Sequence, residues 1–166
     1  MCNFDRAAYG YFYAVRYIAS PEPGDYSACM TNAVPDPAFN LPTKPLSQSR
    51  VAIVTTAALR LRDQDKFLGG DQSFRVLPAS TEGLILGQIS PNFDRSGFIL
   101  DPNVVFPVER LHEMAAEGRI GSVAPQHIAF LGAQGESLAT MIVDSGPAAA
   151  KVLRDEGVDV VLLTPV

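Results

Sequence analysis

Tryptophan is absent from this sequence of 166 residues, and cysteine and histidine each occur only twice. A structural zinc site needs about four ligands at paired spacings, and Cys2, Cys29, His112 and His127 contain no such pair. We therefore expect no metal site and interpret both cysteines as reduced, non-catalytic thiols. The sequence also lacks a nucleophile elbow, a P-loop and a GxGxxG motif, so nothing in it indicates a hydrolase triad.

Long hydrophobic runs and excess positive charge are missing as well. No apolar run approaches the roughly 20 residues that span a bilayer, and the first residues lack the charged and then apolar pattern of a secretory signal. We therefore expect a cytoplasmic protein without membrane contact. The formal net charge of −5 provides no basic surface, so nucleic acid is not an expected partner.

Residues 1–48 differ in composition from the rest of the chain. All five tyrosines and six of the 13 prolines occur there. A helix over residues 6–18 is followed by prolines that block regular structure, which predicts an extended arm up to residue 47. The arm could pack across the domain, reach a partner, or be a loose leader, and the pattern does not decide between these alternatives.

Residues 49–166 predict strands that alternate with helices. The continuous apolar runs 51–57 and 158–163 suit parallel strands covered on both faces, and further strands are predicted over 73–77, 84–89 and 127–131. Helices are predicted from Pro107 to Gly118, over 136–143, and over 147–155, the last with Ser145 as N-cap and Gly157 as stop. Residues 90–103 are predicted to be a loop. The expected fold is α/β, a Rossmann-like three-layer domain with a mainly parallel sheet.

The last predicted strand runs almost to Val166. In open α/β sheets, ligands bind beyond the carboxyl ends of the strands, and a buried parallel strand needs a helix on both faces. We therefore expect a domain that is incomplete at its C-terminus. The alternative, a genuine last strand at a sheet edge, has about equal weight.

Several polar residues are candidates for a functional site. Arg75 shares a strand face with Ser73 and could hold a carboxylate through two parallel hydrogen bonds, although a solvent-facing arginine is the commoner case. His127, at the start of a predicted strand, could act as a general acid or base, although a structural histidine is more frequent.

The loop before Pro107 contains three more candidates, Asp94, Asp101 and Asn103. Loops at helix N-termini can supply polar groups to an anionic ligand. The alternative is turn formation, because aspartate and asparagine side chains mimic backbone turns.

Several segments resemble the glycine/sarcosine/betaine/D-proline reductase selenoprotein B family. The most specific are Asn103-Val104-Val105-Phe106-Pro107 and Gly118-Arg119-Ile120-Gly121-Ser122. Further similar segments are residues 45–57, Gly70-Asp71 with Ser73-Phe74-Arg75, residues 92–98, and residues 157–166. The resemblance extends over about residues 45–166.

The resemblance implies reductive cleavage of a C–N or related bond in a small amino-acid-like substrate. A selenol or thiol would perform it, with electrons from a dithiol donor. Members carry selenocysteine or cysteine directly after the strand that matches residues 158–166, followed by Pro-x-Cys and a helix. A selenocysteine codon read as stop would therefore leave a truncated, inactive product, and this is what we expect here. Other reductase subunits or a thioredoxin-like electron donor are the implied partners.

If the chain is part of such a reductase, the candidate site residues, chosen by their positions in the sequence, are on the substrate side. His127 would move protons, with Asp94 as a second catalytic candidate. Arg75, Asp101, Asn103 and Ser122 would contact the substrate. No other cofactor is expected. The alternative function is a non-catalytic binding or assembly subunit that is complete at residue 166, which the absence of a nucleophile and the long N-terminal arm would support.

Overall fold

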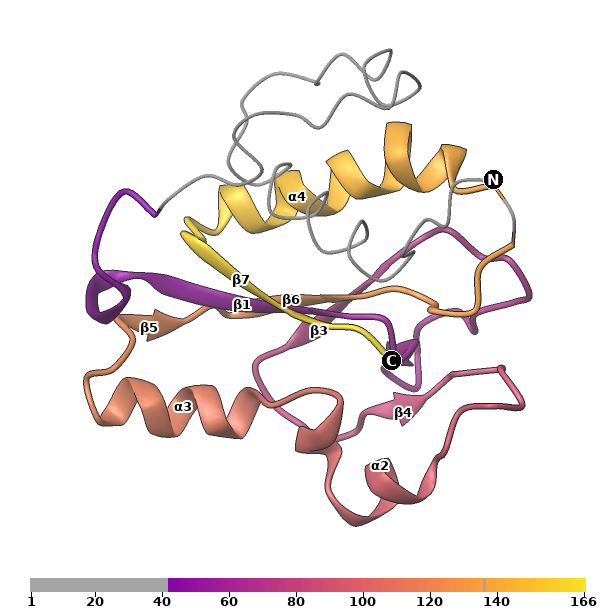
Figure 1. Cartoon of the computed structure of the whole chain (residues 1–166), viewed down its shortest axis with the longest axis horizontal. Helices are drawn as coiled ribbons and strands as arrows, with labels where there is room; N and C mark the ends of the chain where they lie inside the picture. Colours follow the sequence, from indigo (N-terminus) through magenta and orange to yellow (C-terminus); the bar gives the residue numbers. More distant parts are fainter. Residues whose placement is uncertain (1–41, 136) are drawn as a thin grey trace, which may run out of the picture.

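The computed structural model of the chain describes residues 42–135 and 137–166 (Figure 1). The predicted helix over 6–18, both cysteines and most of the predicted arm lie outside the described residues. The arm was predicted to be extended up to residue 47, but its last part forms a short 3-10 helix, η2 (Leu46–Gln48).

A central strand, β1, organises the main sheet. The strands are β1 (Arg50–Thr55), β3 (Arg75–Pro78), β5 (Ser122–Val123), β6 (Gln126–Ala129) and β7 (Val160–Thr164). β1 pairs in parallel with β7 along one side and with β5 and then β6 along the other. β3 pairs antiparallel with β6. The fold is therefore α/β with a mixed sheet. The apolar runs were predicted to be parallel strands, and β1 and β7 do pair in parallel. The antiparallel direction of β3 was not predicted.

Helices lie on opposite faces of this sheet, α4 (Gly146–Asp155) above and α3 (Val108–Ala116) below in Figure 1. Successive side chains of β1 point to opposite faces. Val51 and Ile53 enter the core that contains Leu111 of α3, whereas Ala52 enters the core that contains Leu153 of α4. Both faces of β1 are thereby shielded from water, which explains its continuous apolar sequence.

The helix boundaries follow the sequence signals in two places and depart from them in a third. Gly118 and Gly157 have φ angles of 71° and 68° and end α3 and α4, as predicted. The predicted helix break at Ser145 is wrong. A π-helical turn, η4 (Met141–Ser145), runs directly into α4, and the Ser145 hydroxyl donates to the carbonyl oxygen of Gln72 instead of capping the helix.

Two other predicted segments differ in the structure. Only β4 (Ile85–Leu86) forms within the predicted strand 84–89, and it pairs antiparallel with β2 (Leu59–Arg60) in a separate small sheet. The predicted loop 90–103 contains a short helix, α2 (Ser96–Leu100), and a 3-10 turn, η3 (Pro102–Val104). Strand and helix content in both places depends on long-range contacts that local periodicity does not record.

Candidate functional site

The carboxyl ends of β1, β6 and β7 meet at one edge of the sheet because these strands are parallel. Thr56, which directly follows β1, binds the backbone of Val166 beyond β7. Its Oγ1 accepts a hydrogen bond from the Val166 N–H at 2.8 Å and donates to the Val166 carbonyl oxygen at 3.1 Å. One side chain therefore holds both backbone polar groups of the residue that follows β7.

Gly132 completes this junction from the β6 side. A Cβ atom placed on Gly132 would lie 2.7 Å from the Val166 carbonyl oxygen and 3.0 Å from that of Thr56. Real Cβ atoms essentially never approach backbone atoms at the shorter of these distances, so only glycine fits. The buried Gln88 side chain contacts the same junction, with its Nε2 donating to the Thr56 carbonyl oxygen at 3.4 Å. We call Thr56, Gly132 and Val166 the strand-end junction.

The neighbouring turn contains the backbone outlier of the described residues. Ala58, fully buried, has a φ of 54°, the only positive value at a described non-glycine residue. Its N–H donates to the Phe130 carbonyl oxygen at 2.9 Å, and its own carbonyl oxygen accepts from the Gly87 N–H at 2.9 Å. Strained backbone of this kind persists where surrounding contacts determine it, and it is concentrated at functional sites.

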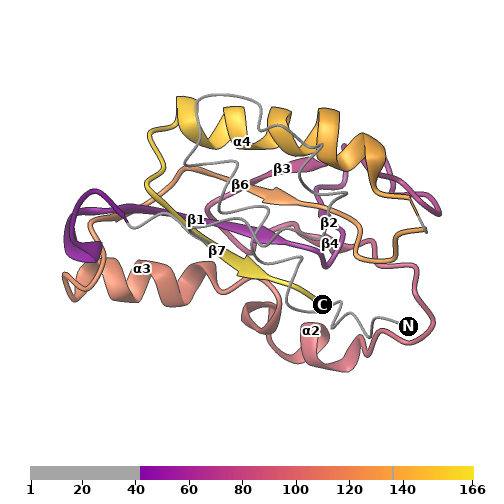
Figure 2. The ribbon, with the colours of Figure 1, turned by 45° about the horizontal axis from the view of Figure 1, so that its top comes forward.

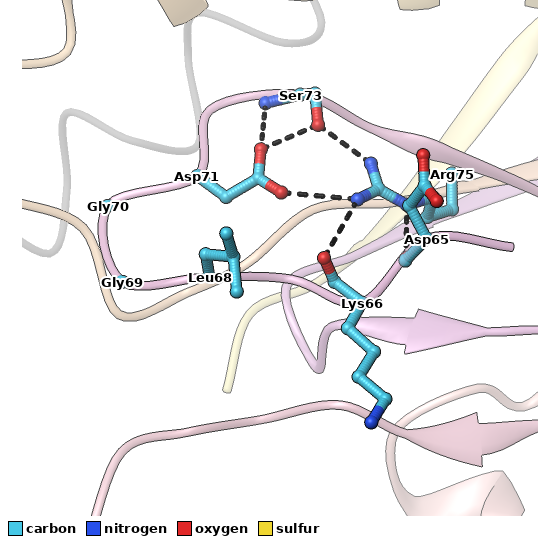
Figure 3. Close-up of a pocket in the computed structure, with 8 residues that line it drawn as sticks. All are labelled: Asp65, Lys66, Leu68, Gly69, Gly70, Asp71, Ser73 and Arg75. Atoms are coloured by element: carbon cyan, nitrogen blue, oxygen red, sulfur yellow. Dashed lines mark hydrogen bonds and ion pairs between the residues drawn. The ribbon is translucent and has the colours of Figure 1, made fainter.

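Arg75 lies at the same edge because β3 runs antiparallel to β6, with Arg75 opposite Ala129. The guanidinium group lies 4.3 Å from the centroid of the Phe67 ring. All five of its N–H groups donate within the protein, to the Asp65, Lys66 and Phe74 carbonyl oxygens, the Ser73 hydroxyl and the Asp71 carboxylate. Figure 3 shows these hydrogen bonds except the one to Phe74. Arg75 therefore fastens the loop of residues 65–75 and has no donor left for a ligand in this arrangement.

Asp71 is the charged partner of Arg75, at 3.1 Å. Burial by itself would raise the pKa of Asp71, but hydrogen bonds from Ser73 and the charge of Arg75 outweigh it and lower the pKa below its ordinary value. The two residues line an open depression together with Asp65, Lys66, Leu68, Gly69, Gly70 and Ser73 (Figure 3). The ion pair is therefore intact at neutral pH.

His127 lies inside the sheet and is fully buried. Its Nδ1 accepts a hydrogen bond from the Ile53 backbone N–H at 2.9 Å, and its ring meets the Phe106 ring edge-on with centroids 5.3 Å apart. Nε2 has no hydrogen-bond partner among the described residues. Burial, and to a smaller extent the charge of His112, lowers the pKa of His127 from 6.5 to about 4. The imidazole is thus neutral at pH 7, and its proton is on Nε2 because Nδ1 is an acceptor.

Asp94, Asp101 and Asn103 stabilise local turns. The Asp94 carboxylate accepts from the Ser96 N–H at 2.9 Å and hydroxyl at 2.7 Å, at the start of α2. The Asp101 carboxylate accepts from the Asn103 N–H at 2.9 Å and side-chain amide at 2.8 Å. These hydrogen bonds lower the pKa of both aspartates.

The position of η3 relates two of these residues to the strand ends. The Thr164 hydroxyl, at the end of β7, donates to the Val105 carbonyl oxygen at 3.0 Å. Asp101 and Asn103 therefore lie on the segment that borders the carboxyl end of β7. Asp94 comes earlier in the chain, just before α2.

Ser122 lies at the opposite edge of the sheet, where β1 and β5 begin. Its hydroxyl accepts from Arg50 Nε at 3.4 Å, and the Arg50 N–H donates to the Asp159 carboxylate at 2.7 Å. The structure thus brings Arg75, Asp101 and Asn103 toward the strand ends, places His127 within the sheet, and separates Ser122 from all of them.

Sequence reasoning did not single out Thr56, Gly132 or Gln88. The available signals were the Thr55-Thr56 pair at the end of a buried strand and Gly132 shortly after another strand. Neither signal shows which distant segment the residue contacts. No group of three or more metal-binding side chains occurs in residues 42–135 and 137–166. No helix of that same region combines the length and apolar character needed to cross a membrane.

Comparison with known proteins adds two matches. The family model for glycine/sarcosine/betaine reductase selenoprotein B matches residues 86–166, which include Gly132 and Val166 of the junction. The D-proline reductase subunit gamma of Acetoanaerobium sticklandii is 36% identical over 133 residues, covering 78% of this chain and 54% of the relative. The chain belongs to the glycine/sarcosine/betaine/D-proline reductase selenoprotein B family. No solved structure matches.

The predicted family membership is therefore confirmed. This member of the selenoprotein B family spans about half the length of the curated relative that it matches.

Proposed function

We propose that the chain forms the substrate side of a selenol- or thiol-dependent reductase that cleaves a C–N or related bond of a small amino-acid-like substrate. Family membership supports the reaction class. The observation that carries the location is the strand-end junction, where the carboxyl ends of β1, β6 and β7 converge. In α/β sheets, this is the edge at which ligands bind.

The proposed reaction needs a source of two electrons. Cleaving a C–N bond to a C–H and an N–H bond consumes two electrons and two protons, which a dithiol supplies as it becomes a disulfide. Residues 42–166 contain no cysteine. We propose that the reacting selenol or thiol belongs to a segment outside the described residues, and that these residues bind and orient the substrate.

A Rossmann-like three-layer arrangement is the fold interpretation that agrees with this proposal. α3 and α4 lie on opposite faces of the sheet (Figure 2). β6, which comes earlier in the chain, lies on one side of β1, and β7, which comes last, lies on the other side. Such a reversal of strand order opens a crevice between strand ends. In this chain, the crevice would lie between the ends of β1 and β7, at Thr56 and Val166.

The residues proposed to border the substrate are those nearest to this edge. Arg75 shapes the loop of residues 65–75, while Asp101 and Asn103 lie on the segment beside the end of β7. The catalytic roles of His127 and Asp94 and the substrate contact of Ser122 stay predictions, as does a cytoplasmic location.

An NMR titration tests the proposed location. D-Proline, glycine, sarcosine and betaine are added in turn to the 15N-labelled chain of 166 residues, with acetate as control for carboxylate binding alone. At least one amino compound should shift the amide signals of Thr56, Gly132 and Val166 saturably, and acetate should not. Absence of a saturable shift for all four compounds would overturn the proposal.

A non-catalytic binding or assembly subunit is the second candidate function. The lack of cysteine in residues 42–166 favours it, as does the relative's designation as a subunit. Its partners would be other reductase subunits or a thioredoxin-like electron donor. Affinity for such a protein with no saturable binding of the four small compounds would support this function over the first.

A further inference from the structure

The outer edge of β7 is unpaired among the described strands. β7 pairs only with β1, whose other side is occupied by β5 and β6. Figure 2 shows β7 at the margin of the sheet. The Thr56 N–H donates to the Thr164 carbonyl oxygen at 3.2 Å, so the backbone groups of Thr164 face β1. Because the direction alternates along a strand, those of Val161 and Leu163 face outward.

The composition of β7 is that of an interior strand. Its five residues are Val-Val-Leu-Leu-Thr, without a charge or a proline. Natural edge strands are protected by charged side chains, proline, bulges or a covering segment, whereas strands inside parallel sheets are continuously hydrophobic. An interior type of strand therefore occupies an edge position in the described part of the molecule.

Two exposed hydrophobic side chains lie beside this edge, and the carboxylate at its start is paired. Leu162 is 38% exposed, and Val104, next to the residue that binds Thr164, is 58% exposed. At the other end, the Asp159 carboxylate is already bound by Lys44 at 2.8 Å and by the Arg50 N–H at 2.7 Å. A strand approaching this edge would thus bury apolar surface without leaving the Asp159 carboxylate unpaired.

We propose that the outer edge of β7 docks one further parallel strand, supplied by the part of a selenoprotein B family reductase that these 166 residues do not include. The D-proline reductase subunit gamma has a source for such a strand, because the match covers only 54% of its length. A parallel partner is expected because parallel strands are the ones buried as continuous apolar runs. The proposal rests on family membership and does not depend on the proposed catalytic role.

A co-expression experiment tests this edge. The 166-residue chain is produced together with the portion of the relative outside the matched region. Strand addition is driven by main-chain hydrogen bonds, so the unmatched portion of a relative that is 36% identical over the matched 133 residues can serve as the probe. In the complex, hydrogen exchange at the Val161 and Leu163 amides should slow at least tenfold. Exchange at Leu162, whose N–H already faces β1, should change little.

A charged variant locates the contact. Leu162→Lys adds the kind of charge that protects natural edges and should weaken the complex at least tenfold. Val143→Lys, at a 64% exposed position of η4 away from the edge, is the matched control and should leave it unchanged. Thermal unfolding of both variants shows whether the chain remains folded.

The proposal would be overturned if no complex forms, or if both folded variants lose the complex equally. It would also be overturned if Val161 and Leu163 are protected in the dilute chain alone, because the chain would then cover its own edge. Protection that depends on the concentration of the chain alone would overturn it as well, because two copies would then pair. None of these outcomes bears on the titration with small compounds, so the two proposals fail separately.

Discussion

The Ile53 backbone N–H donates a hydrogen bond to Nδ1 of His127, which lies 74 residues further along the chain. β1 pairs with β5 through Arg50 and Val51 and with β6 through Val54 and Thr55. Between these pairings the neighbouring strand is interrupted, so the Ile53 N–H has no backbone acceptor on that side. The imidazole takes the place of the missing backbone acceptor, which explains why a polar side chain is fully buried in the sheet.

Replacing the imidazole by a ring without an acceptor should destabilise the protein. In His127→Phe the Ile53 N–H stays buried without a partner, and we expect a loss of about 1–3 kcal/mol in the free energy of unfolding. Urea denaturation measures it. The exposed His112 provides the control, since His112→Phe should change stability much less. Equal effects of the two substitutions would contradict the structural role of His127.

The low pKa of His127 predicts a pH dependence. The folded protein holds the pKa at about 4, below the ordinary value of 6.5, so the unfolded chain takes up a proton first as the pH falls. The stabilisation is therefore complete above pH 6.5 and is lost as the pH drops from 6.5 toward 4. Between pH 8 and pH 5, the free energy of unfolding should fall by about 2 kcal/mol from this group.

Denaturation at both pH values checks this expectation. His127→Phe should show a much flatter dependence in the same range, because it lacks the titrating group. A wild-type slope that the variant fully retains would assign the dependence to other groups.

The strand-end junction predicts a pair of contrasting substitutions at Thr56. Thr56→Val keeps the shape of the side chain but removes both hydrogen bonds to Val166, at about 1 kcal/mol each. Thr56→Ser keeps the hydroxyl. Hydrogen exchange at the Val166 amide should accelerate at least tenfold in the valine variant and little in the serine variant. Unchanged exchange in Thr56→Val would show that the hydroxyl does not hold the end of β7.

Gly132 should not tolerate a methyl group. In Gly132→Ala the new Cβ would lie 2.7 Å from the Val166 carbonyl oxygen, and the backbone shift should cost about 1–3 kcal/mol. Gly135→Ala is the control, because a Cβ there meets no atom within 4 Å. Denaturation midpoints compare the two variants, and equal midpoints would contradict the close contact of the strand ends.

Arg75 should not be replaceable by lysine. Lysine keeps the charge but cannot reproduce the five hydrogen bonds or the planar contact with Phe67, so Arg75→Lys should lose about 2–3 kcal/mol of stability. Arg110→Lys is the matched control, since Arg110 forms an exposed ion pair with Glu113 and should change by no more than about 0.5 kcal/mol. Urea denaturation distinguishes these outcomes, and a neutral Arg75→Lys would mean that the network contributes little.

The hydrogen bonds of Arg75 show why local sequence cannot distinguish a ligand-binding arginine from a structural one. The prediction put Ser73 and Arg75 on one strand face, whereas β3 begins only at Arg75, yet the two side chains do contact each other at 2.7 Å. Three of the other acceptors of Arg75 are carbonyl oxygens of Asp65, Lys66 and Phe74. Backbone acceptors carry no sequence signature, so a saturated arginine and a ligand-binding arginine have the same local pattern.

The sequence by itself determined the α/β class, the apolar strands β1 and β7, the glycine stops of α3 and α4, and the family. These features depend on hydrophobic periodicity, turn chemistry and motif residues, which are local. Only the tertiary structure decided that His127 fills a gap in the sheet, that Ser122 lies at the opposite edge from Arg75, and that Thr56 and Gly132 meet Val166. These relationships join residues that are far apart in the sequence, and they follow from strand order and register, which only the packed sheet specifies.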